Sequence, residues 1–303
     1  MKSSAPPRDD AARPGARFGD YLELTKPRLS MLSVMTALVG YFAARPAFDA
    51  GRIGLLALGT SLAAGGVSSL NQWMESDTDA RMRRTALRPI PAGKIAGGSA
   101  FVIGWLMCIA SLMLTFALVG RLAALFTLLT IAAYLGWYTP AKRSSRWSTE
   151  IGAIAGALPP LIGWSAAEGG VSALGWILFG VLFFWQIPHF MAIAWTYRRD
   201  YAAVNFPMLP VRDEAGGRVA LWSFAATLAL VAVSVLPAYL RLDSAWYAAA
   251  ALAAGALFLL RAAQFMRPGN RDAAARRLFM FSLAYLPLLL GLLVADRLLA
   301  RHP

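Results

Sequence analysis

The sequence predicts an all-α membrane protein that crosses the bilayer about nine times. Hydrophobic residues make up 58% of the 303 residues, charged residues only 15%, and the mean hydropathy is +0.54. Such values are far too apolar for a soluble domain of this length. A bilayer core about 30 Å thick requires roughly 20 apolar residues per spanning helix. Nine runs of about this length occur near residues 27–45, 53–73, 97–118, 121–139, 150–168, 172–194, 219–240, 245–266 and 276–296.

Several of these spans carry a further signal in their composition. The second span is rich in Gly, Ala and Ser and is therefore less strongly hydrophobic than a span of Leu, Ile and Val would be. Such small residues allow neighbouring helices to pack closely. The third span contains Cys108, the only cysteine, so the chain has no disulfide framework and no thiolate cluster. The fifth span contains the pair Pro159 and Pro160, which should kink or break its helix.

The basic residues predict the orientation of the chain. If nine spans place the two chain ends on opposite sides, the N-terminal side carries all but six of the 29 lysines and arginines. The six on the other side are Arg45, Arg52, Arg121, Arg241, Arg297 and Arg301. The positive-inside rule therefore places the N-terminus and the long loops in the cytoplasm. The net charge of +13 reflects this topology and not a nucleic-acid site, although such a face also attracts anionic substrates.

The N-terminal tail and the domain division follow from composition. Residues 1–18 are rich in Pro, Ala and charge, which is typical of a disordered cytoplasmic tail. The tail lacks the short apolar core of a signal peptide, and Asp9 and Asp10 argue against a mitochondrial transit peptide. No loop is long enough to form a soluble domain. We therefore expect residues 19–303 to form a single transmembrane domain.

Two loops stand out by length and content. One covers about residues 74–96 and the other about residues 195–218. Each follows an even-numbered span, lies on the same face, begins with a helix end that carries acids, and contains arginines and a proline. This parallel suggests two related halves that meet at a central cavity on the cytoplasmic side.

The first of these loops opens with a spaced set of oxygen ligands. If the second span continues as a helix, Asn71, Glu75 and Asp79 follow one another at intervals of four residues and share one face. Asp77 points roughly opposite to them. Two carboxylates and an amide suit Mg²⁺, which commonly takes one or two carboxylates together with phosphate oxygens. The motif therefore predicts a phosphorylated substrate.

Arginines that could bind such a phosphate follow directly. They are Arg83, Arg84 and Arg88. An alternative is an ordinary charged helix end at the membrane surface, at which Glu75 and Asp79 only form ion pairs with these arginines.

The chain resembles a known family at this motif. The pattern N-x3-E-x3-D followed by RTALRP resembles the first motif of the UbiA-type intramembrane prenyltransferases. The resemblance runs from LTKPRLSML through most of the chain and includes YTPAKRSS, IGAIAGALPPLIGW and FFWQIPHFMAIAWTYRRDYAAVNFPMLPV. The segment WQIPHF is not expected in relatives that act on quinone or chlorophyll precursors. It is similar to the branch of the family that farnesylates heme.

The resemblance implies a nine-span fold in which Asn71, Glu75 and Asp79 hold Mg²⁺ against the diphosphate of farnesyl diphosphate. It also implies a second acidic motif, D-x3-D in many relatives, which here begins at Asp200 but has Val204 in place of the second acid. Asp200 is expected to bind a second Mg²⁺ or a metal-bound water. Cations are expected to stabilise the departing diphosphate. They are Arg84, Arg88, Lys142 and Arg143.

The acceptor that the resemblance implies is heme b, one of whose vinyl groups would take the farnesyl group and a water to give heme O. His189 is the candidate for contact with heme iron, a propionate or a water. Trp185 and Tyr197, with Phe190 and Trp195, are candidates to line a porphyrin pocket. Each of these residues could instead have a structural role. A buried histidine can form a hydrogen bond between helices, and aromatic residues are common at the membrane interface.

Two other functions are compatible with this architecture. One is prenyl transfer to another acceptor, such as an aromatic quinone precursor, against which WQIPHF argues. The other is transport, against which the position of the acids at one membrane edge argues. The composition favours a bacterial plasma membrane. The resemblance adds a heme A synthase or terminal oxidase assembly factors as candidate partners.

Overall fold

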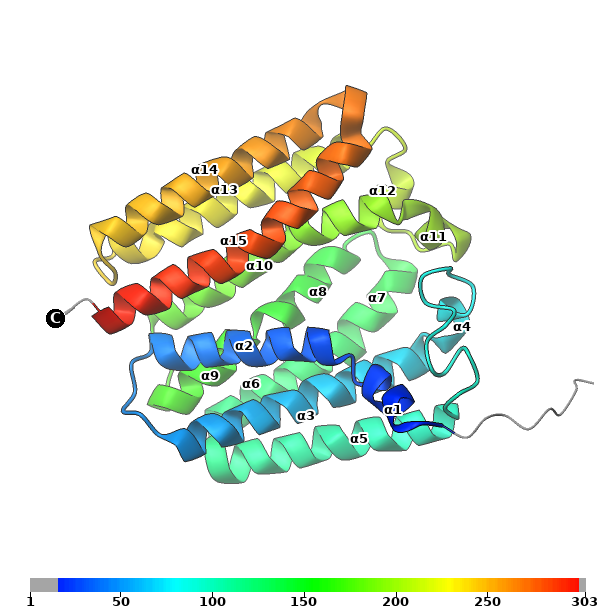
Figure 1. Cartoon of the computed structure of the whole chain (residues 1–303), viewed down its shortest axis with the longest axis horizontal. Helices are drawn as coiled ribbons and strands as arrows, with labels where there is room; N and C mark the ends of the chain where they lie inside the picture. The colour runs from blue at the N-terminus through cyan, green and yellow to red at the C-terminus, as the bar shows by residue number, and fades with distance from the viewer. Residues whose placement is uncertain (1–15, 300–303) are drawn as a thin grey trace, which may run out of the picture.

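The computed structural model describes residues 16–299, which form helices joined by turns and contain no β-strand (Figure 1). The predicted all-α fold is confirmed, and each of the nine predicted spans corresponds to a helix or to a short series of consecutive helices. They are α2 (Pro27–Ala43), α3 (Ala50–Met74), α5 (Gly97–Leu114) with η1 (Thr115–Val119), α6 (Arg121–Ala132) with η2 (Ala133–Tyr138) and α7 (Thr139–Ser144), α8 (Ser148–Ala157) with α9 (Pro159–Glu168), α10 (Ala173–Thr196), α13 (Gly217–Tyr239), α14 (Ala245–Met266), and α15 (Arg271–Leu299).

Seven of these nine spans are long and apolar enough to cross a membrane by length and composition alone. The remaining two are α2, which has 17 residues, and the fifth span, which is divided into α8 and α9 with 10 residues each. The division falls at Pro159, the first residue of α9. Proline has no backbone N–H to donate to the preceding turn, so it is most favourable in the first turn of a helix. The predicted break at the proline pair is therefore confirmed.

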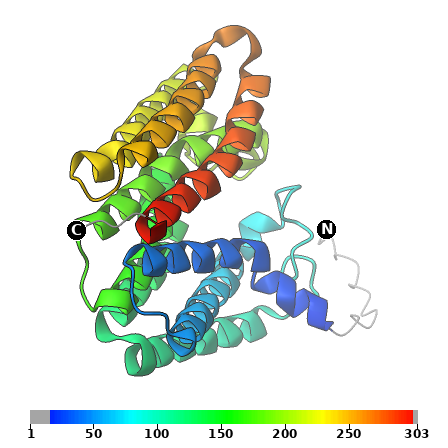
Figure 2. The same cartoon turned by 60° about the vertical axis from the view of Figure 1, so that its left-hand side comes forward.

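The helices form two groups that pack side by side (Figures 1 and 2). The first group contains α2, α3, α5, α6, α8 and α9, and the second contains α10, α13, α14 and α15. The second group and its contacts with α8 and α9 form the largest cluster of buried apolar side chains. The first described helix and the end of α15 lie at opposite ends of the bundle, as an odd number of crossings requires.

Four short helices gather at the end of the bundle where the two long loops lie. They are α1 (Phe18–Leu24), α4 (Ser76–Asp79), α11 (Arg198–Ala203) and α12 (Leu209–Arg212). Of the predicted N-terminal tail, residues 1–15 lie outside the described residues, and its last residue, Phe18, begins α1. Two predicted loops of distant sequence thus meet on one face.

Helices α2 and α9 of the first group approach each other closely at two glycines. A Cβ atom on Gly163 would lie 1.7 Å from the carbonyl oxygen of Ala37, and one on Gly40 would lie 2.0 Å from that of Pro160. Each glycine therefore admits the backbone of the other helix. The second span uses small residues in the same way, since a Cβ on Gly66 of α3 would lie 2.8 Å from the carbonyl oxygen of Gly104 in α5.

Gly163→Ala is expected to push α2 and α9 apart and to lower the free energy of unfolding by about 1–3 kcal/mol, because no side chain can move aside to admit the methyl group. Thermal unfolding in detergent measures the effect. Gly54→Ala in α3 is the control, since nothing lies within 4 Å of its Cβ position. Equal stability of the Gly163→Ala variant and the parent protein would contradict the close crossing.

Candidate active site

The predicted ligand set lies at the junction of α3 and α4. The helix is interrupted at Glu75, whose φ of −102° and ψ of 6° are not helical. The backbone N–H of Glu75 still donates to the carbonyl of Asn71 at 3.0 Å, and that of Asp79 donates to the carbonyl of Glu75 at 2.8 Å. The four-residue spacing is therefore kept across the interruption. Asn71, Glu75 and Asp79 are all buried, with exposures of 1%, 4% and 0%.

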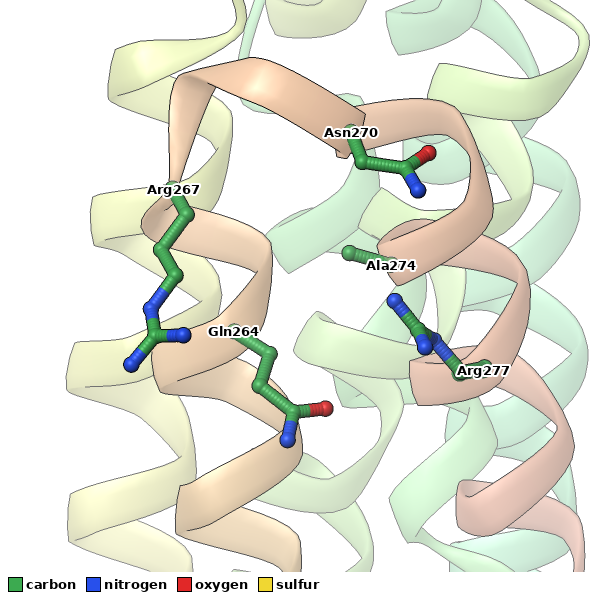
Figure 3. A pocket seen from close by; sticks show the side chains of 5 residues that line it. All are labelled: Gln264, Arg267, Asn270, Ala274 and Arg277. Atoms are coloured by element: carbon green, nitrogen blue, oxygen red, sulfur yellow. The ribbon is translucent and has the colours of Figure 1, made fainter.

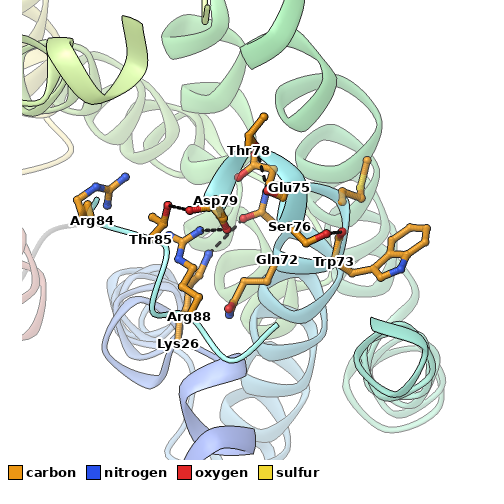
Figure 4. Close-up of polar contacts among 12 residues, drawn as sticks. Lys26, Gln72, Trp73, Glu75, Ser76, Thr78, Asp79, Arg84, Thr85 and Arg88 are labelled. Atoms are coloured by element: carbon orange, nitrogen blue, oxygen red, sulfur yellow. Dashed lines mark hydrogen bonds and ion pairs between the residues drawn. The ribbon is translucent and has the colours of Figure 1, made fainter. Parts of the chain in front are cut away.

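Three cations from three other segments contact these side chains. Two of them, Lys26 and Arg88, are labelled in Figure 4. Arg88, in the loop after α4, lies 2.5 Å from Asp79 Oδ2. Lys142 of α7 lies 2.9 Å from Glu75 Oε1, and Lys26, just before α2, donates to Asn71 Oδ1 at 3.2 Å. We call these six side chains the polar cluster. It joins segments that are far apart in the sequence.

The polar cluster carries more positive than negative charge. Burial raises the pKa of Glu75, but the nearby charges of Lys142, Lys26 and Arg88 outweigh this effect and hold its pKa below the usual range. Burial, together with the charges of Arg88 and Lys142, lowers the pKa of Lys26 to about 7. An anion placed beside the cluster would relieve the repulsion among the three cations. The electrostatics therefore favour binding of a phosphate or diphosphate.

Lys26 was not singled out by the sequence, although its backbone is unusual. Its φ of 47° places it in the left-handed region, and it immediately precedes Pro27. A lysine in this region is strained, and such strain persists only where surrounding contacts hold it. The fold holds Lys26 there with its ammonium group at Asn71. The only sequence signal is a cation next to the proline that starts a span.

Asp77 and Arg143 form a separate ion pair. The Asp77 side chain is 58% exposed and lies 2.6 Å from Arg143, which also donates to the backbone carbonyl of Met74. Asp77 thus lies apart from the buried motif, as its position on the helix predicts. Arg143 is paired with Asp77 and makes no contact with Asn71, Glu75 or Asp79. Lys142 and Arg143 are adjacent in the sequence but form ion pairs with different carboxylates, those of Glu75 and Asp77.

The second long loop meets the first through Arg84 and an apolar contact. Arg84 donates to the hydroxyl of Tyr201 at 3.4 Å and lies over the ring of Tyr197, 5.4 Å from its centroid. Asp200 lies in α11, directly before Tyr201, and is half-buried. Val204, at the position of the missing second acid, is buried in one cluster with Met82 of the first loop. An apolar contact between the loops thus takes the place of a carboxylate.

His189 lies within α10 and contacts α15. Its Nδ1 lies 2.7 Å from the hydroxyl oxygen of Ser282, and its ring stacks on Trp185 with centroids 4.6 Å apart. Trp185 donates its indole N–H to the backbone carbonyl of Ser282. The second ring nitrogen of His189, Nε2, has no hydrogen-bond partner within residues 16–299. The contacts fix the orientation of the imidazole and leave one nitrogen available.

The polar cluster fits a hard divalent cation that brings other ligands with it. Asp79 Oδ1 is buried and has no hydrogen-bond partner in the described part of the chain. Within residues 16–299, no three His, Cys, Asp or Glu side chains group closely enough to hold a metal. Asp200 is therefore not joined to Glu75 and Asp79 in a three-acid site. Two carboxylates and an amide, completed by water and phosphate oxygens, suit Mg²⁺.

Comparison with known proteins supports the fold. A model described as the UbiA prenyltransferase family matches residues 33–284. The chain is 70% identical to a protoheme IX farnesyltransferase of Opitutus terrae over 283 residues, which cover 93% of this chain and 96% of the relative.

Two solved structures share the fold at low sequence identity. One comes from a study of digeranylgeranylglyceryl phosphate synthase in membranes, with a TM-score of 0.78, 16% identity, and coverage of 92% of this chain and 98% of the other. The second is a UbiA homolog from Archaeoglobus fulgidus bound to GPP and Mg²⁺, with a TM-score of 0.64 and 13% identity. It covers 90% of this chain and 99% of its own.

Lys142→Met is expected to lower the free energy of unfolding by about 3–5 kcal/mol at neutral pH, because it leaves Glu75 buried without its cation. Adding Glu75→Gln should recover most of the loss. Since the folded-state pKa of Glu75 is lowered, the ion pair stabilises the fold above pH ~4 and loses its effect on further acidification. Unfolding in detergent at several pH values measures this. The matched control is Arg143→Gln, which breaks an exposed pair worth at most about 1 kcal/mol.

Proposed function

The chain belongs to the UbiA prenyltransferase family, and from that premise we propose that it transfers the farnesyl group of farnesyl diphosphate to a vinyl group of protoheme IX (heme b). Addition of water completes the reaction and gives heme O. The 70% identity to a protoheme IX farnesyltransferase over nearly all of both chains is the observation that carries the proposal. The buried, cation-rich polar cluster supplies the chemistry that a diphosphate leaving group requires.

We assign binding of Mg²⁺ to Asn71, Glu75 and Asp79, with Asp200 as a further ligand from the second loop. The buried Oδ1 of Asp79, which has no hydrogen-bond partner in the described part of the chain, supports this assignment for the first motif. When bound, Mg²⁺ would neutralise diphosphate oxygens and so make the diphosphate a better leaving group. The structure of the Archaeoglobus fulgidus homolog with GPP and Mg²⁺ is consistent with a metal requirement.

The cations of the polar cluster are proposed to bind the diphosphate as its bond to the farnesyl carbon breaks. Lys26, Arg88 and Lys142 are held in place by Asn71, Asp79 and Glu75 before substrate arrives, so little reorganisation is needed during the reaction. Arg84, in the first loop, contacts the ring of Tyr197 and the hydroxyl of Tyr201 in the second loop, and it would add a further contact to the diphosphate. Arg143 would act indirectly, by fixing α7 against α4 through Asp77.

In the proposed reaction the diphosphate departs with the electron pair of the carbon–oxygen bond, and a heme vinyl carbon forms the new carbon–carbon bond. Water then adds to the resulting cation and releases a proton. His189 and Trp185 are the residues that we assign to heme, because Ser282 and the stacking contact fix the imidazole ring. Tyr197 would also line the part of the site that binds heme. Apolar helices around the site would exclude excess water, which would otherwise hydrolyse the diphosphate.

The cellular setting of the reaction is part of the proposal. We place the protein in a bacterial plasma membrane with the polar cluster and both long loops on the cytoplasmic side, because the basic residues concentrate there. Residues 19–303 would then act as one transmembrane domain. A heme A synthase or terminal oxidase assembly factors are the proposed recipients of heme O.

Incubation of the purified protein with heme b, farnesyl diphosphate and Mg²⁺ is expected to give a porphyrin product heavier by one farnesyl group and one water. Mass spectrometry with and without a chelator measures the product, which the chelator should abolish. Asp79→Asn should lower turnover by more than about 100-fold, because it weakens stabilisation of the leaving group. Glu214→Gln is the control, since this carboxylate is exposed in the second loop and lies outside the polar cluster.

Two results would contradict this proposal. Farnesyl transfer to an aromatic acid but not to heme would keep the family and change the acceptor. Full activity of the Asp79→Asn variant would remove the metal assignment.

His189→Ala is expected to reduce the use of heme by about tenfold or more, while binding of farnesyl diphosphate stays unchanged, because His189 has no contact with the polar cluster. Steady-state kinetics with heme as the varied substrate, together with direct binding of farnesyl diphosphate, separate these effects. Ser282→Ala should cause a smaller loss by freeing the imidazole ring. If His189→Ala weakened both substrates equally, a structural role for the histidine would be the correct assignment.

A further inference from the structure

A polar pocket lies between the ends of α14 and α15, apart from the polar cluster (Figure 3). It has a volume of about 270 Å³ and is lined by Gln264, Arg267, Asn270, Ala274 and Arg277. At about 30 Å³ per water molecule, this volume holds a phosphate group with several waters. The turn that joins α14 to α15 lies at the same end of the bundle as the two long loops (Figure 1).

The polar groups of this pocket can donate hydrogen bonds but are not committed to protein acceptors. The side chains of Arg267 and Arg277 have neither a hydrogen bond nor an ion pair with any residue from 16 to 299. Arg261 donates to Oε1 of Gln264 at 3.1 Å. Because a guanidinium group only donates, the amide oxygen is the atom that it binds, and the amide nitrogen stays free to donate. The pocket therefore favours an anion.

The neighbouring Arg271 shows what a structural arginine does in the same hairpin. It donates to the backbone carbonyls of Phe265 and Met266, the last residues of α14, at 3.3 and 3.1 Å. These bonds satisfy carbonyl groups that a helix end leaves without partners. Within residues 16–299, Arg267 and Arg277 make no such hydrogen bonds to backbone carbonyls, although they lie in the same short segment.

An exposed apolar surface extends along α14 and α15 away from the pocket. Leu260 and Leu257 precede Gln264 by four and seven residues on α14, so they share its face, and they are 52% and 54% exposed. Met280 follows Arg277 by three residues on α15 and is 59% exposed. Since α14 runs towards the pocket and α15 runs away from it, these side chains lie further from this end of the bundle than the arginines.

We propose that this pocket binds the phosphate head group of an anionic phospholipid from the cytoplasmic leaflet, whose acyl chains lie on the apolar surface of α14 and α15. The order of cationic pocket and apolar surface along the helices matches the order of head group and chains in a lipid. Basic pockets between spanning helices on this side of a membrane bind anionic lipid head groups in this way. A soluble anion would not make use of the apolar surface.

Native mass spectrometry of the full-length protein in detergent, titrated with phosphatidylglycerol, tests the proposal. We expect one molecule to bind with an affinity clearly above that for phosphatidylcholine. Arg267→Gln combined with Arg277→Gln should weaken this first binding event by about tenfold or more, and each single substitution by a few-fold. The single variants keep the test valid if the double variant folds poorly.

The matched control replaces Arg218 and Arg276 by glutamine. Both are exposed arginines near the same end of the bundle, neither lines the pocket, and the change in net charge is identical. This control should bind phosphatidylglycerol as the parent protein does. An equal loss in the control would mean that only general charge attraction acts and would overturn the site.

Two further outcomes would also overturn the proposal. Equal binding of phosphatidylcholine would show that the head-group charge is not recognised. Glycerophosphoglycerol, which is the head group without acyl chains, is expected to bind far more weakly than the lipid. If it bound as tightly, the pocket would be a site for free anions.

Discussion

The arrangement of the candidate active site depends on one constraint. The two carboxylates buried at α4 and its junction with α3, those of Glu75 and Asp79, each require a cation. A buried charge without a partner destabilises a fold by several kcal/mol, so the partners must come from elsewhere in the chain. Arg88 meets Asp79 from the loop after α4, and Lys142 meets Glu75 from α7. Through these contacts the acids organise a loop that has almost no regular secondary structure of its own.

The same contacts explain why the site would bind its substrate strongly. Lys26 is added to the two ion pairs and brings an excess of positive charge into a buried region. The fold itself must stabilise this excess, and it does so partly through a strained backbone at Lys26. A diphosphate would balance the charge. In the proposed mechanism, diphosphate binding would therefore relieve the electrostatic repulsion among the three cations.

The sequence was sufficient for the fold and for the first motif, because both depend on local patterns. Apolar runs of fixed length predict the spans, the prolines predict the break before α9, and the four-residue spacing of Asn71, Glu75 and Asp79 survives the interruption at Glu75. The pairing of charges was not predictable. Whether Lys142 or Arg143 faces Glu75 depends on how α7 packs against α4, which the two adjacent residues do not reveal. The role of Lys26 required the tertiary contact, and Val204 gave no sign that it packs against Met82.

The glycine contact between α2 and α9 also constrains the order of events during synthesis. Gly40 and Gly163 are complementary, so the face of α2 that carries Gly40 has no partner until the fifth span has emerged from the ribosome and entered the bilayer. Until then α2, at 17 residues, must be accommodated by lipid, by its immediate neighbours or by the insertion machinery. The contact between α2 and α9 can therefore form only after the fifth span has been synthesised, late relative to the synthesis of α2.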